Sequence, residues 1–207
     1  MKKLMLGLVI ASSLGLTACG DETIKDVQEN VAAEEPMFTA SARVVFDPTA
    51  GDLSVPNDLL FQGSTDGTLN LPVADPTDES DPYVALSALD GWSTVNPFVL
   101  GIDFPQGRTL DGDSVFSPSS VRIFEAVMGG DTSDDTCASL ERGLACKIVG
   151  ELTYTEDFIT QKSGNSIAVV PLKPLKAKTT YLVALTDNLL DSTGKAIAGS
   201  STYELVS

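Results

Sequence analysis

The chain has 207 residues, which suits one domain with a short extension. Its 13 Lys and Arg stand against 29 Asp and Glu, and a net charge of −16 repels polyanions, so nucleic acid is excluded as a partner. There is no histidine, which removes the usual general base of serine and cysteine hydrolases and the commonest neutral metal ligand.

Residues 1–18 predict a lipoprotein signal peptide. Two lysines precede an apolar stretch at 4–16 that is shorter than the ~20 residues needed to span a bilayer. The Leu-Thr-Ala-Cys at 16–19 resembles the bacterial lipobox, which implies cleavage before Cys19 and attachment of lipid to it. The resemblance implies three acyl chains, enough for stable membrane attachment without a spanning helix. An ordinary secretory signal beside a cysteine is the alternative.

Gly20 stands where proteins retained at the inner membrane carry aspartate. We therefore expect an outer-membrane lipoprotein at the cell surface or on the extracellular side. Residues 19–41 follow as an acidic tether, since six acidic residues, one lysine and little apolar material cannot form a core.

Two further cysteines, Cys137 and Cys146, lie nine positions apart in a polar stretch with glycine and aspartate. In an exported protein this pair predicts a disulfide that closes a short loop. Two free thiols are the alternative, and two cysteines without histidine make a poor zinc site.

From residue 42 onward, short apolar runs separated by Asp, Pro and Gly predict β structure. The expected strands are 43–46, 53–61, 98–104, 121–128, 147–155, 166–172, 181–186 and 203–206, with two helical turns at 83–90. We expect a mainly β fold, with an N-terminal β and loop segment at 42–97 and an antiparallel immunoglobulin-like β-sandwich at 98–207. The sequence pattern of residues 170–197 resembles that of bacterial immunoglobulin-like modules. It includes an expected turn in which Asp191 accepts hydrogen bonds and Gly194 supplies a positive φ.

The closest approach to a G-x-S-x-G nucleophile elbow surrounds Ser166, in the sequence Gly-Asn-Ser-Ile-Ala. The elbow requires a helix after the serine, whereas a strand is expected here, and Ala168 replaces the second glycine. Since no histidine can activate the hydroxyl, we expect no catalytic residue in this chain.

Three acidic clusters could bind calcium, which prefers several oxygen ligands from a turning backbone. They comprise Asp75, Asp78, Glu79 and Asp81, then Asp111 and Asp113, then Asp131, Asp134 and Asp135. None has the EF-hand spacing, so solvated acidic loops are the prediction and one structural calcium is the alternative. The sequence gives no separation or cleft that would favour a glycosidase-like pair of catalytic carboxylates. We expect no metal and no cofactor.

The chain has a single tryptophan, Trp92, and we expect it to pack in a core or an interface.

Five stretches together resemble one known family. They are residues 19–27, 42–48, 53–61, 66–70 and 89–94, with Leu-Asp-Gly-Trp-Ser-Thr as the last. They are similar to the N-terminal region of the bacterial virulence-factor lipases, extracellular lipases and phospholipases that include surface lysophospholipase lipoproteins. In that family an α/β-hydrolase domain carrying the nucleophile lies downstream in a longer protein. The chain lacks the elbow, the histidine and the βα alternation of that domain, so no catalytic residue is carried over.

The resemblance implies a non-catalytic N-terminal module of a surface-anchored lipase or lysophospholipase. Its expected partners are the membrane, through lipid on Cys19, and the downstream hydrolase domain. The alternative is a stand-alone outer-membrane lipoprotein that binds a protein or a glycan through the loops of its β-sandwich.

Overall fold

A computed structural model describes residues 41–206. The expected signal peptide at 1–18, the lipidation of Cys19 and all but the last residue of the expected tether at 19–41 lie outside the described residues. Residues 41–207 are assigned to one compact unit. Within the described part, no helix combines the length and the apolar character needed to cross a bilayer.

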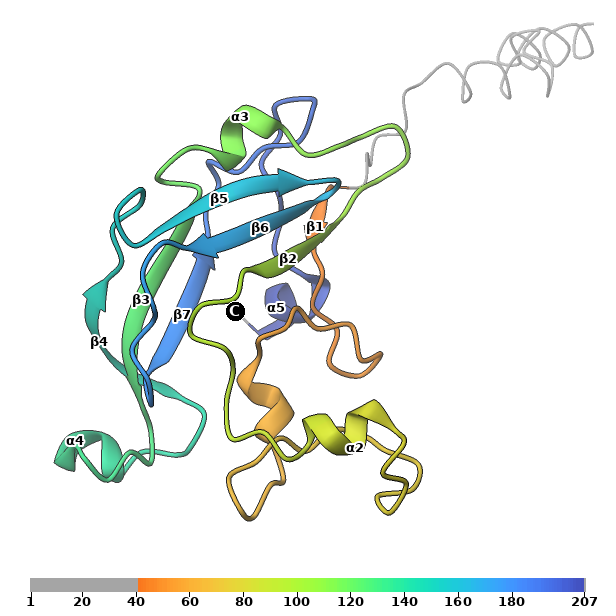
Figure 1. Cartoon of the computed structure of the whole chain (residues 1–207). Coiled ribbons are helices and arrows are strands. Elements are labelled where there is room, and N and C mark those ends of the chain that lie inside the picture. The colour runs from red at the N-terminus through yellow and green to blue at the C-terminus, as the bar shows by residue number, and fades with distance from the viewer. Residues whose placement is uncertain (1–40, 207) are drawn as a thin grey trace, which may run out of the picture. The chain divides into compact units, whose positions relative to one another are not determined.

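Seven strands form two antiparallel sheets in the described residues (Figure 1). The first has the order β1 (Arg43–Val44), β2 (Phe98–Asp103), β6 (Ser166–Pro171) and β5 (Phe158–Ser163). The second has the order β4 (Ala145–Glu151), β3 (Val121–Met128) and β7 (Thr180–Leu185). The chain changes sheets after β2, β4 and β6, and the expected mainly β, antiparallel sandwich is confirmed.

Short helices occupy the connections and the C-terminal end. They are η1 (Asp58–Phe61), α2 (Pro82–Leu86), α3 (Gly112–Val115), α4 (Asp135–Ala138) and α5 (Ser201–Val206). Each of the first four begins at an Asn or Asp whose side chain accepts a hydrogen bond from a backbone amide two residues on. Of the two helical turns expected at 83–90, the structure has the first part as α2, which ends at Leu86.

The two sheets share one hydrophobic core, to which alternate strand residues contribute. In β3, Val121 and Ile123 are buried while Arg122 between them is exposed. In β6 of the other sheet, Ile167 and Val169 are fully buried. This period of two is the strand geometry that places one face of each sheet inside. The other buried members of the core are Ala42, Ile102, Leu110, Val115, Phe158 and Leu189.

Two of the expected strands are wrong. Within 53–61, Pro56 has no amide to donate to a sheet, and the Asn57 side chain accepts from the Leu59 amide at 3.0 Å, which starts η1. Residues 203–206 lie in α5, because the Ser200 hydroxyl accepts a hydrogen bond from the Tyr203 amide at 3.0 Å and caps a helix there.

One strand, β5, was missing from the expected set. Only its first two residues are apolar, and the remainder reads Thr-Gln-Lys-Ser, which resembles a loop. The structure pairs it with β6 through a two-residue Gly164-Asn165 turn in which Gly164 has φ of 61°. A Gly-Asn pair between two possible strands is itself a hairpin signal, so β5 could have been predicted from the sequence.

The strand expected at 147–155 is present, shifted toward the N-terminus, as β4.

The turn expected at 191–194 is present around a buried carboxylate. Asp191 is 1% exposed and accepts hydrogen bonds from the amides of Thr193 at 2.8 Å and Lys195 at 3.1 Å. Arg108 forms an ion pair with it at 3.0 Å, and Gly194 has φ of 78°. Burial by itself raises the pKa of Asp191, but the hydrogen bonds and the arginine outweigh it, so the pKa is lowered.

We expect Asp191→Asn to lower the free energy of unfolding by about 3 kcal/mol at pH 7, because it leaves the largely buried Arg108 without its partner charge. A lowered pKa means that the ionised carboxylate stabilises the fold above the unfolded pKa of about 3.9, and that this contribution is lost as the pH falls through the lower folded pKa. Urea unfolding should therefore show a difference between wild type and variant that shrinks below about pH 4.

Asp187→Asn is the matched control, since Asp187 is exposed on the same connection. It should change the free energy of unfolding by less than about 0.5 kcal/mol. Equal effects of the two substitutions at pH 7 would contradict the structural role given to Asp191.

Candidate functional site

The beginning and the end of the described chain meet at one place, which we call the terminal junction (residues 42–44 and 198–204). The Val44 amide donates to the Ala198 carbonyl at 3.1 Å, and the Ala198 amide donates to the Ala42 carbonyl at 2.8 Å. On its other side, β1 pairs with β2. Residues 42–44 are therefore held between the four-stranded sheet and the segment that leads into α5.

The side chain of Arg43 reinforces the terminal junction. Its guanidinium donates to the Gly199 carbonyl at 2.9 Å and forms an ion pair with Glu204 of α5 at 2.6 Å. The two charged side chains are 37% and 46% exposed, so the ion pair contributes no more than about 1 kcal/mol. The backbone pairing, rather than this charge pair, holds the two ends together.

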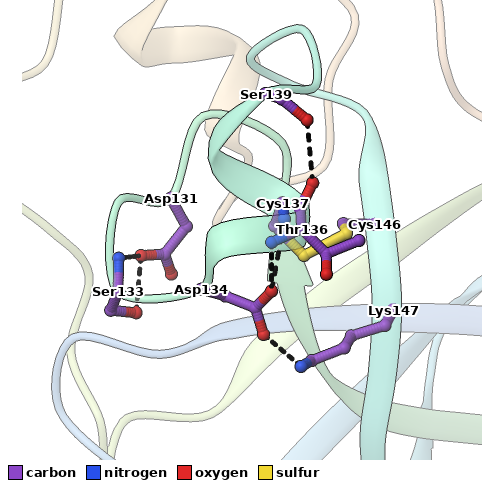
Figure 2. Close-up of a disulfide and its surroundings, with 8 residues drawn as sticks. All are labelled: Asp131, Ser133, Asp134, Thr136, Cys137, Ser139, Cys146 and Lys147. Carbon is purple, nitrogen blue, oxygen red and sulfur yellow. Dashed lines mark hydrogen bonds and ion pairs between the residues drawn. A yellow bond between two sulfur atoms is a disulfide. The ribbon is translucent and has the colours of Figure 1, made fainter.

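A second constrained region is the loop closed by the Cys137–Cys146 disulfide, which ties α4 to β4 (Figure 2). The S–S distance is 2.09 Å and Cys137 is fully buried, so the predicted pairing is present. Asp134 accepts from the amides of Thr136 and Cys137 and pairs with Lys147 (Figure 2). The Lys147 ammonium and the Cys137 amide lower the pKa of Asp134. For so short a loop the disulfide contributes about 3 kcal/mol or less.

The structure places Ser166 at the start of β6, directly after the hairpin turn. It pairs with Ser163 of β5 on one side and Gly101 of β2 on the other. A nucleophile elbow requires a strand, then the serine, then a helix, whereas Ser166 is followed by a strand. The serine therefore belongs to the ladder of a sheet and does not have elbow geometry.

The acidic clusters are used in local turns. Asp75, Asp78 and Asp131 each accept hydrogen bonds from the amide and hydroxyl of the Thr or Ser two residues on, and these bonds lower the pKa of each. Asp81 and Asp111 cap α2 and α3. Across residues 41–206, no three His, Cys, Asp or Glu side chains gather closely enough to hold a metal ion.

A shallow hollow of about 360 Å³ lies against β3 and β4, with Arg122, Glu151 and Tyr154 in its lining. Arg122 donates two hydrogen bonds of 2.8 Å to Glu151 and lies over the ring of Phe124 at 4.8 Å. The pair lowers the pKa of Glu151 and raises that of Arg122. Because these two charges neutralise each other, the hollow has no evident selectivity for a charged ligand.

Residues 50–97 form an extension with little regular structure, which we call the acidic lobe. Figure 1 shows it in orange to yellow-green, carrying η1 and α2 beside the sheets. It contains eight Asp and Glu and neither Lys nor Arg. Among the large apolar side chains of this described segment only Leu69 is buried, and it lies outside the core cluster. Six others are exposed: Val55, Leu59, Tyr83, Leu86, Leu89 and Val95.

Trp92 packs within the acidic lobe, as expected for core or interface packing. Its ring lies edge-on to Phe61, with centroids 6.2 Å apart and planes at 78°. The indole N–H is buried, and among residues 41–206 no acceptor contacts it.

Sequence reasoning found the disulfide and the Asp191 turn, but it did not find the terminal junction or the acidic lobe. The acidic character of the lobe could have been predicted from the sequence, because no basic residue occurs between Arg43 and Arg108. The terminal junction had no such signal, since it joins residues more than 150 positions apart.

Comparison with known proteins gives one result for this chain. Residues 33–207 match the family described as bacterial virulence factor lipase N-terminal. No curated protein and no solved structure matches the chain. The match covers most of the sequence, including the terminal junction, the disulfide loop and the acidic lobe, and the chain therefore belongs to the bacterial virulence factor lipase N-terminal family.

Proposed function

We propose that this chain is the non-catalytic N-terminal module of a surface-anchored bacterial lipase or lysophospholipase. It attaches to the outer membrane through lipid on Cys19 and holds a downstream α/β-hydrolase domain. Membership of a family defined by the N-terminal part of lipases supports this role. The terminal junction is the observation that carries it, because it fixes where an anchor and a following domain are joined to the fold.

The chain enters the fold at Ala42 and reaches α5 at Ser201, only three residues after Ala198, which pairs with both Ala42 and Val44. The 22 residues after Cys19 span at most about 75 Å even when fully extended. A domain that continues from α5 would join the module near Arg43, because Glu204 of α5 forms an ion pair with that side chain.

Two chemical properties support an exported, lipid-anchored protein. The disulfide is stable in oxidising compartments and rare in the cytosol. The net charge of −16 gives no attraction to anionic lipid, so attachment depends on the acyl chains of Cys19 rather than on electrostatics.

Cys19→Ser should abolish incorporation of labelled fatty acid and release the protein from the membrane fraction, because the acyl chains are its anchor. The measurement is metabolic labelling followed by fractionation of cells. A Cys137→Ser/Cys146→Ser variant is the control and should keep the label. A wild-type protein without label would refute the anchor.

The purified chain should not hydrolyse short-chain esters or lysophospholipid, because Ser166 lies in a sheet ladder and no histidine is present. Its turnover should equal that of Ser166→Ala in the same assay. Turnover above that variant would show that the module is catalytic. A stop codon directly after the codon for Ser207 would favour the stand-alone binding protein instead.

A further inference from the structure

The acidic lobe leaves six of its large apolar side chains exposed and buries only Leu69 fully. Tyr83 is 55% exposed, Val95 is 56% exposed and Leu86 is 44% exposed. The lobe contributes no residue to the shared core, although its turns and short helices are ordered by capping side chains. An ordered segment with so little apolar burial of its own is typical of a surface that is completed by a partner.

The charge of the acidic lobe decides between kinds of partner. All eight of its charged side chains are acidic, including the exposed Glu79 and Asp90. Anionic lipid and a second copy of this acidic chain would both be repelled. A protein face with an apolar centre and a rim of Lys or Arg satisfies both the exposed apolar side chains and the carboxylates.

We infer that the acidic lobe is the surface on which the downstream hydrolase domain docks, through a face of that domain that is apolar and basic. This inference rests on the proposed function, since it assigns the position of the partner named there. The peptide chain that continues from α5 would join the two domains covalently, and the lobe would fix their orientation.

Hydrogen exchange of the amides in α2 tests the inference. The amides of Ala85, in α2, and of Ser87 and Leu89, in the turn that follows it, are hydrogen-bonded and report local opening of the lobe; together we call them the α2 amides. In the full-length lipase they should exchange at least about tenfold more slowly than in the 207-residue chain, because docking covers the lobe. The Ala138 amide of α4 is the internal control, and its exchange should be equal in both proteins.

Substitutions in the full-length lipase separate the apolar and the charged contributions. Leu86→Ser should return the α2 amides to the faster exchange, whereas Leu140→Ser, which replaces a leucine of matched 43% exposure near α4, should not. A Glu79→Lys/Asp90→Lys variant should also return the α2 amides to the faster exchange, because its new lysines would face the basic residues of the partner domain. Exchange at Ala138 checks that each variant remains folded.

Three results would overturn the inference. Equal exchange of the α2 amides in the two proteins would refute docking on the lobe, while the anchoring and hydrolysis results would leave the proposed function standing. Protection that rises with the concentration of the 207-residue chain would assign the lobe to a second copy. Protection of that chain on vesicles of anionic phospholipid would assign it to the membrane.

Discussion

Residues 42–44 are held on two sides, by β2 in the four-stranded sheet and by the backbone of residue 198 ahead of α5. This pairing decides where the chain enters the sandwich and where it leaves. It depends on backbone hydrogen bonds more than on the exposed Arg43–Glu204 ion pair. The buried Ala42 beside it connects the terminal junction to the hydrophobic core, so the ends cannot separate without exposing core surface.

The rest of the molecule divides into parts with different physical requirements. The sandwich is stabilised by alternating apolar residues from both sheets and by the buried Asp191–Arg108 pair. The loop around α4 relies on the disulfide and on Asp134, which suits a hairpin that buries little besides Cys137. The acidic lobe has no disulfide and no residue in the core cluster, and six of its large apolar side chains are exposed. On the proposed function, these parts correspond to a platform, a locally braced loop and a docking surface.

Much of the fold could be predicted from local patterns. Short apolar runs bounded by turn residues identified strands such as β3 and β6, and in the structure their buried faces carry Val and Ile at alternate positions. The strands predicted at 53–61 and 203–206 were wrong because Asn57 and Ser200 cap helices there. In each case one side-chain oxygen accepts a hydrogen bond from a backbone amide at the start of the helix. The polar second half of β5 is stabilised by pairing with β6. Hydrophobic patterns in the sequence do not detect a strand whose stability comes from backbone pairing. The terminal junction is a long-range backbone contact, for which a single sequence carries no signal.

Proximity of the two ends of the fold is the central claim, and a distance measurement between spin labels tests it most directly. The labels would be attached to cysteines introduced as Ser41→Cys and Leu205→Cys, and Leu205 is 86% exposed. The protein would also carry Cys19→Ser, so that no other free thiol remains, because Cys137 and Cys146 form the disulfide. Since α5 is only about 9 Å long and begins three residues after Ala198, the distance should be no more than about 25 Å. A distance near 40 Å, roughly the full width of a domain of this size, would contradict the account.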